Sequence, residues 1–116
     1  MKIYTYKSCS TCRNAIKYLN EKGIEYTELP IRETPPNPVE LQFMLTQYDG
    51  NIKRLLNTSS KDYRELGIKD RIDTMTPSEV FELLQKNGNL VKRPFLITDD
   101  YGLVGFKVDE WDKTLK

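Results

Sequence analysis

Apolar and polar residues alternate at the start of the chain and then repeat with helical spacing. Residues 2–6 alternate as a half-buried strand does, and residues 24–29 do so again. Between them, from about residue 11 to residue 22, the apolar spacing predicts a helix that ends at Gly23. Because a strand, a helix and a strand in this order form a βαβ unit, we expect the two strands to be parallel.

The middle of the chain, residues 37–87, predicts a mostly helical block. Asn37 followed by proline begins one helix, which ends at Gly50. Thr76, again followed by proline and with glutamate three positions on, is the clearest helix start in the chain. Short helices are expected between these two, the last of them ending at Gly67. The residues expected to face inward are Leu41, Met44, Leu45, Tyr48, Val80, Leu83 and Leu84.

The C-terminal part returns to a strand pattern. Residues 95–98 form a short apolar strand, residues 99–102 a turn, and residues 103–106 a strand that pairs back as a hairpin. A final helix is expected over residues 108–115, with Trp111 packed inward. The pattern therefore predicts an α/β fold with a mixed four-stranded sheet.

Length and composition favour one compact domain over residues 1–116, with a helical insertion at about residues 37–88. Apolar residues make up 38% of the chain, charged residues 30%, and the net charge is +1. The absence of a basic block argues against direct nucleic-acid binding, and no apolar run is long enough to span a membrane. The first residues lack the apolar segment of a secretory signal, so we expect a cytoplasmic protein.

The chain contains no histidine, which excludes catalysis by a cysteine–histidine pair. Its two cysteines are too few for a closed zinc site. No phosphate-binding loop or dinucleotide motif occurs. We therefore expect neither a bound cofactor nor a metal.

The two cysteines, Cys9 and Cys12, lie between the first strand and the first helix. At a helix start, free N–H groups and the helix dipole stabilise a thiolate, so the pKa of Cys9 should fall below the free value of about 8.5. We interpret Cys9 as the reactive thiol and Cys12 as its resolving partner. The anion would be held by the backbone amides from Ser10 to Cys12 and by the Thr11 hydroxyl. Arg13 would add positive charge. The alternative is that both cysteines are small buried apolar residues.

Arg93 and Pro94 precede the third predicted strand. A cis peptide bond here would let the chain turn sharply, as in thioredoxin-like folds, which this arrangement resembles and in which such a proline lies beside the reactive cysteine. Arg93 would then stabilise the thiolate or bind an oxyanion near Cys9. The alternative is that Lys92 and Arg93 are solvated surface charges and that Pro94 is a trans residue at a strand start.

Several segments resemble the ArsC/Spx family and together cover nearly the whole chain. Residues 6–15 resemble its reactive loop, residues 92–97 its second motif, and residues 104–110 its C-terminal hairpin and helix start, while residues 55–59 and 63–67 match its helical block. The resemblance implies a thioredoxin-like fold with a helical insertion. By its pair of cysteines the chain is most similar to an uncharacterised ArsC-like branch on the Spx side.

The arsenate-reductase branch of this family uses one nucleophilic cysteine, matched by Cys9, and three arginines that hold the oxyanion. Arg93 matches one of them. Asn57 and Phe106 align where the other two are expected, and Lys107 is the nearest cation to the second position. We therefore expect little or no arsenate turnover. The resemblance implies glutathione, glutaredoxin or thioredoxin as the thiol donor.

Spx-like regulators carry a CxxC pair, sense oxidation through it, and bind the C-terminal domain of the RNA polymerase α subunit. Gly50 lies at about the position of a glycine used in that contact, although a helix stop explains a glycine there equally well. The leading hypothesis is a cytoplasmic thiol–disulfide oxidoreductase, resembling arsenate reductases, that uses Cys9 and Cys12. The alternative is an Spx-like redox-sensing transcriptional regulator.

Overall fold

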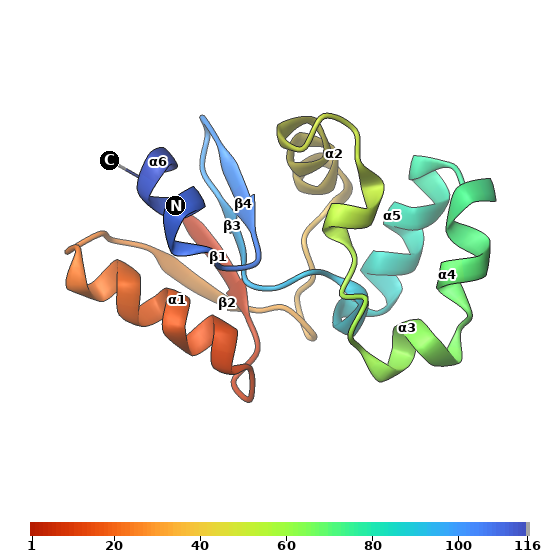
Figure 1. The fold of residues 1–116 in the computed structure, drawn as a ribbon, viewed down its shortest axis with the longest axis horizontal. Helices are drawn as coiled ribbons and strands as arrows, with labels where there is room; N and C mark the ends of the chain where they lie inside the picture. The colour runs from red at the N-terminus through yellow and green to blue at the C-terminus, as the bar shows by residue number, and fades with distance from the viewer. Residues whose placement is uncertain (116) are drawn as a thin grey trace.

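A four-stranded mixed sheet organises the computed structural model, which describes residues 1–115 (Figure 1). The strand order is β2-β1-β3-β4, with β1 at Lys2–Thr5, β2 at Thr27–Pro30, β3 at Phe95–Ile97 and β4 at Gly102–Val104. β1 pairs in parallel with β2 and antiparallel with β3, and β4 pairs antiparallel with β3. The predicted mixed sheet and parallel first pair are therefore confirmed.

Helices cover the two faces of the sheet unequally. Helix α1, Ser10–Glu21, and helix α6, Val108–Thr114, lie together on one side, whereas the helices between β2 and β3 lie on the other (Figure 1). That second group consists of α2 (Pro38–Gln47), η1 (Ile52–Leu55), α3 (Lys61–Glu65), α4 (Ile68–Arg71), η2 (Ile72–Thr74), α5 (Pro77–Lys86) and η3 (Gly88–Leu90).

The strands alternate between two hydrophobic cores, as their period of two requires. Ile3 in β1 and Leu96 in β3 face α1 and α6, where they pack with the fully buried Trp111. Tyr4 and Phe95, one position away in each strand, face the helical block. Their rings meet edge to face with centroids 5.7 Å apart.

Capping signals in the sequence begin the two longest helices of the block. Asn37 accepts from the Glu40 amide at the start of α2, and Thr76 accepts from the Glu79 amide at the start of α5. Both glutamate carboxylates accept from the amide of the cap residue, so the capping boxes are complete. Both predicted helix starts are confirmed. No helix in residues 1–115 is long and apolar enough to cross a lipid bilayer.

The second strand begins at Thr27, three residues later than the sequence pattern predicts. Gly23 adopts a positive φ of 67°, and the Ile24 amide still bonds to the Leu19 carbonyl at 3.0 Å as the helix ends. Ile24 and Tyr26 then pack against the core beneath α1 without joining the sheet. Alternation in this segment therefore reflects packing after a helix end, and the predicted strand start was wrong.

Two further predictions need correction in the helical block and the hairpin. In α5, Phe81 is buried, whereas Leu83, which the pattern placed inward, is only half-buried. β4 occupies residues 102–104, earlier than the predicted residues 103–106. The chain does turn at Gly67, with φ at 61°, but it continues at once into α4, whose Ile68 is buried.

Candidate active site

Cys9 is the N-cap of helix α1, placed there by a tight turn after β1. Its amide donates to the Tyr6 carbonyl at 3.0 Å, which closes the turn. Its Sγ accepts from the Cys12 amide at 3.2 Å, in the position that a serine or aspartate oxygen takes in an ordinary cap. The sulfur therefore receives an N–H group that the helix leaves free, at the positive end of the helix dipole.

The two thiols experience different surroundings. Cys9 is half-buried, whereas Cys12 is 1% exposed, and both are free cysteines. Burial opposes ionisation of Cys9, but hydrogen bonding from Cys12 and the guanidinium of Arg93 outweigh it and lower the pKa of Cys9. Burial, followed by the interactions with Cys9, raises the pKa of Cys12. These opposite pKa shifts make Cys9, rather than Cys12, the thiol that ionises more readily.

Sheet register brings Arg93 to Cys9. β3 runs antiparallel to β1 with Tyr4 opposite Phe95, so the residues just before β3 lie beside the end of β1 and the loop that follows it. The Arg93–Pro94 peptide bond is cis, and the trans alternative is not adopted. Pro94 is buried and its carbonyl accepts from the Gly105 amide at 2.9 Å.

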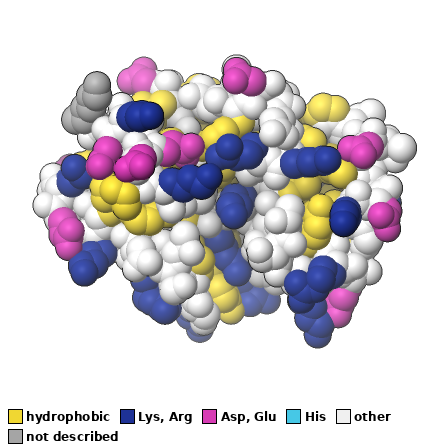
Figure 2. Space-filling model, viewed as in Figure 1, with side chains coloured by type: hydrophobic (Ala, Val, Ile, Leu, Met, Phe, Trp, Pro, Cys, Tyr) yellow, Lys and Arg dark blue, Asp and Glu magenta, His cyan; other side chains and the backbone are white. Residues whose placement is uncertain are grey.

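A cleft of about 590 Å³ opens in front of Cys9, between the sheet and the helical block. Four basic side chains line it, and none of its lining residues is acidic. Figure 2 shows Lys and Arg side chains gathered along the middle of this face of the molecule. The lining residues are Cys9, Thr11, Arg54, Asn57, Ser59, Lys92, Arg93, Val104, Gly105, Phe106 and Lys107. Such a cleft attracts anions and favours a thiolate over a neutral thiol.

A short backbone pairing outside the sheet places residues of the helical block at this cleft. Leu56 and Val91 form an isolated antiparallel bridge. On either side of it, the Asn57 amide donates to the Leu90 carbonyl at 2.7 Å and the Lys92 amide donates to the carbonyl of residue 55 at 2.8 Å. Residues 54–57 therefore lie against the segment that leads into Arg93.

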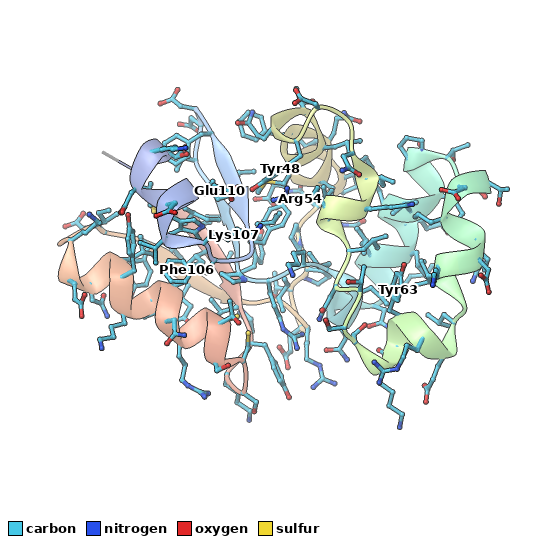
Figure 3. All side chains as sticks on the ribbon, in the orientation of Figure 1. Tyr48, Arg54, Tyr63, Phe106, Lys107 and Glu110 are labelled. Carbon is cyan, nitrogen blue, oxygen red and sulfur yellow. The ribbon has the colours of Figure 1, made fainter. Side chains whose placement is uncertain are left out.

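Arg54 is held at the cleft by two neighbours that Figure 3 labels. Its Cζ lies 4.4 Å from the ring centroid of Tyr48, and its Nη2 lies 3.7 Å from Glu110 Oε2. The Tyr48 hydroxyl donates to Glu110 Oε1 at 3.1 Å and accepts from the Val104 amide at 3.0 Å. This network joins the helical block to β4 and α6.

Asn57 and Phe106, where the resemblance leads us to expect family arginines, both line the cleft. The cations beside them come from neighbouring positions, Arg54 and Lys107. No local sequence pattern marks Arg54, because its place in the cleft depends on the Leu56–Val91 bridge. Lys107 is predictable from the sequence only as the cation nearest to Phe106.

The structure brings together only some of the predicted site residues. Cys9, Thr11 and Arg93 share the cleft. Ser10 is exposed in the first turn of α1. The Arg13 guanidinium donates to the Lys7 carbonyl at 3.1 Å.

Cys12 lies behind Cys9, and together with Arg13 it lines a separate hollow of about 270 Å³. Within residues 1–115, no group of three or more His, Cys, Asp or Glu side chains is placed to hold a metal ion.

A model of the ArsC family matches residues 4–114, nearly the full chain. The chain belongs to the ArsC family. It is 39% identical to the uncharacterized protein YusI of Bacillus subtilis over 110 residues, which are 95% of this chain and 93% of YusI. It is 32% identical to the global transcriptional regulator Spx of Listeria innocua over 108 residues, covering 93% of this chain and 81% of Spx.

The crystal structure of an ArsC family related protein from Bacteroides fragilis superposes on this ArsC-family chain with a TM-score of 0.90. The two are 41% identical, and the match covers 97% of this chain and 94% of the other. The resemblance to the ArsC/Spx family and the thioredoxin-like fold that it implied are both confirmed.

Proposed function

We propose that this protein is a cytoplasmic thiol–disulfide oxidoreductase in which Cys9 is the nucleophile and Cys12 the resolving thiol. One observation carries the proposal: the sulfur stabilised as a thiolate opens to the cationic cleft, and its partner thiol is buried directly behind it. Cys9 faces the larger cleft, whereas Cys12 is 1% exposed and lines only the smaller hollow, so Cys9 is the thiol that a substrate meets first. This asymmetry supports Cys9 as the attacking thiol and Cys12 as the resolving thiol.

The reaction begins when the Cys9 thiolate attacks one sulfur of a substrate disulfide. A Cys9–substrate disulfide forms, and the other half of the substrate leaves as a thiolate. Cys12 Sγ then attacks Cys9 Sγ, its proton passes to the departing thiolate, and the second half of the substrate leaves. The substrate has gained two electrons, and the protein holds a Cys9–Cys12 disulfide, which two thiols of a donor reduce in the reverse manner.

The cleft selects substrates and donors that carry negative charge near the sulfur. The Arg93 guanidinium stabilises the Cys9 thiolate directly, and Thr11 lines the same cleft. Ser10 through its amide, Arg13 and Pro94 border the anion site in this proposal, and Arg13 also supports the loop by donating to the Lys7 carbonyl. Glutathione, whose carboxylates flank its thiol, fits this charge pattern, with glutaredoxin or thioredoxin as protein donors. We expect little arsenate turnover, because two of the family's three arginine positions hold other residues.

Trapping the mixed disulfide tests this order of attack. The Cys12→Ser variant, incubated with oxidised glutathione, should accumulate one glutathione on Cys9, identified by mass spectrometry of peptides. The wild-type protein should instead end as the Cys9–Cys12 disulfide, and Cys9→Ser should carry no adduct. An adduct on Cys12 in the Cys9→Ser variant, at the rate seen for Cys9, would overturn the proposal.

The likeness to Spx favours a second candidate, a redox-sensing regulator of transcription that binds the RNA polymerase α subunit. The pair of cysteines supports it, and Gly50 is exposed with open space around its Cα. Gly50 also has a φ of 79°, so its conformation alone accounts for glycine. A pull-down with the C-terminal domain of the α subunit, on the reduced and the oxidised protein, separates the two candidates. Binding in neither state would eliminate the regulator.

A further inference from the structure

Arg93 reaches the Cys9 cleft with few polar contacts of its own. Its Nη1 is buried and has no hydrogen-bond partner, the single side-chain nitrogen or oxygen of which this is true within residues 1–115. No salt bridge involves it in the part of the chain that the structure describes. Its Cζ lies 4.9 Å from the ring centroid of Tyr6, so this aromatic face orients the guanidinium together with the interaction with Cys9.

Three interactions hold Tyr6 in place, one through its backbone carbonyl, one through its hydroxyl and one through its ring. Its carbonyl accepts from the Cys9 amide at 3.0 Å, so it belongs to the turn that presents the thiol. The Arg32 Nη1 donates to its hydroxyl at 2.9 Å, and the Arg32 Cζ lies 5.0 Å from its ring centroid. The ring is therefore in contact with two guanidinium groups, one exposed and one in the cleft.

The segment that carries Arg32 is tied to the sheet and to the helical block. The neighbouring Ile31 is fully buried, and its amide donates to the Thr5 carbonyl at 2.9 Å. A Cβ at Gly88 would lie only 2.2 Å from the Ile31 carbonyl oxygen, so η3 and this segment are in backbone contact. Arg32 consequently approaches Tyr6 from a fixed backbone.

We propose that Tyr6 is a positioning residue, whose ring holds the Arg93 guanidinium against Cys9 and is itself held by Arg32. This inference rests on the proposed function and adds a residue to it. The CxxC pattern does not reveal Tyr6, because its partner in the stack lies far along the chain, in the segment just before β3. The variants in the test leave the other charged groups of the cleft unchanged, namely Arg54, Lys92 and Lys107.

The test measures the rate of iodoacetamide alkylation of Cys9 against pH in five proteins: the wild type, Tyr6→Leu, Tyr6→Phe, Arg93→Ala and the double variant. Tyr6→Leu removes the aromatic face and should raise the pKa measured for Cys9 by about 0.5. Tyr6→Phe is the matched control, because it keeps the face and removes only the hydroxyl, and its Cys9 should titrate close to wild type. In an Arg93→Ala background, Tyr6→Leu should have no further effect, because the group that the ring positions is gone.

An equal rise of the Cys9 pKa on Tyr6→Leu with and without Arg93 would overturn the role of Tyr6, as would no rise in the wild-type background. A wild-type Cys9 pKa at the free-thiol value would instead overturn the proposed function itself. NMR supplies a test in the unmodified protein if Tyr6→Leu does not fold. The Arg93 side-chain protons should be shifted upfield by the Tyr6 ring current, and unshifted resonances would also overturn the stack.

Discussion

Replacing Glu40 by glutamine should destabilise the protein by about 2 kcal/mol at pH 7. Glu40 is 8% exposed and stands in the first turn of α2, where its carboxylate meets three donors. Oε1 accepts from the Tyr4 hydroxyl at 2.7 Å and from the Asn37 amide at 3.0 Å. Oε2 forms an ion pair with Lys2 Nζ at 2.9 Å. The network joins α2 to β1, the strand that leads to the cysteine loop.

The magnitude follows from what a glutamine side chain retains. Its carbonyl oxygen can keep both bonds made by Oε1, each weakened by about 0.5 kcal/mol because the acceptor is no longer charged. Its amide nitrogen would face the Lys2 ammonium, so the ion pair is lost. That loss is about 1 kcal/mol, because the Lys2 side chain is 49% exposed and becomes hydrated.

The pH dependence provides a second signature of the same group. Burial opposes ionisation of Glu40, but the hydrogen bonds from Tyr4, Asn37 and Lys2 outweigh it and hold the pKa of this carboxyl below its ordinary value of 4.5. The stabilisation is therefore present in full above pH 4.5 and is lost as the pH falls through the lowered pKa. The Glu40→Gln variant should lack this part of the acid sensitivity.

Urea denaturation followed by the fluorescence of Trp111 measures both effects, at pH 7 and at successively lower pH. The matched control is Glu79→Gln. Glu79 has the same role in the second capping box, with Thr76, but its side chain is exposed. It should lose only a small fraction of what Glu40→Gln loses. Equal losses for the two variants, or a gap between wild type and Glu40→Gln that stays constant into acid, would refute the argument from burial.

Two further substitutions test the charge beside Cys9 and the backbone contact between Gly88 and Ile31, and a third serves as a control for the glycine. Arg93→Gln should raise the pKa measured for Cys9 by about 1, because an opposite charge beside the thiolate is removed, and alkylation rates against pH report it. Gly88→Ala should cost about 3 kcal/mol in urea denaturation, because its Cβ would meet the Ile31 carbonyl oxygen at 2.2 Å. Gly23→Ala, which meets open space, should cost about 1 kcal/mol for its positive φ alone.

Local signals in the sequence predicted the elements that local chemistry determines. Asn37 and Thr76 begin their helices as expected, because a capping box satisfies the first amides within four residues of chain. The start of β2 was wrong because Ile24 and Tyr26 alternate for packing, while pairing with β1 decides where the strand begins. The burial of Phe81 likewise depends on how α5 sits against its neighbours.

The same division holds within the candidate site. Cys9 and Cys12 could be assigned distinct surroundings from the sequence, because the strand, the turn and the helix start are contiguous. Arg93 required the additional assumption of a thioredoxin-like sheet. Arg54 and the Tyr6–Arg93 stack could not be predicted, because each joins segments that meet only after the sheet and the helical block have formed.

Under the proposed function, activation of the thiol and selection of its substrate depend on different parts of the protein. The helix start, the Cys12 amide and Arg93 act on Cys9 itself, and these parts are complete. The remaining cations of the cleft come from other segments, and two positions where the family resemblance places arginine hold Asn57 and Phe106. On the proposed function, the chain keeps a reactive cysteine while its anion site departs from the three-arginine pattern that the resemblance implies. We therefore expect it to prefer a disulfide with a charged flank over a small oxyanion.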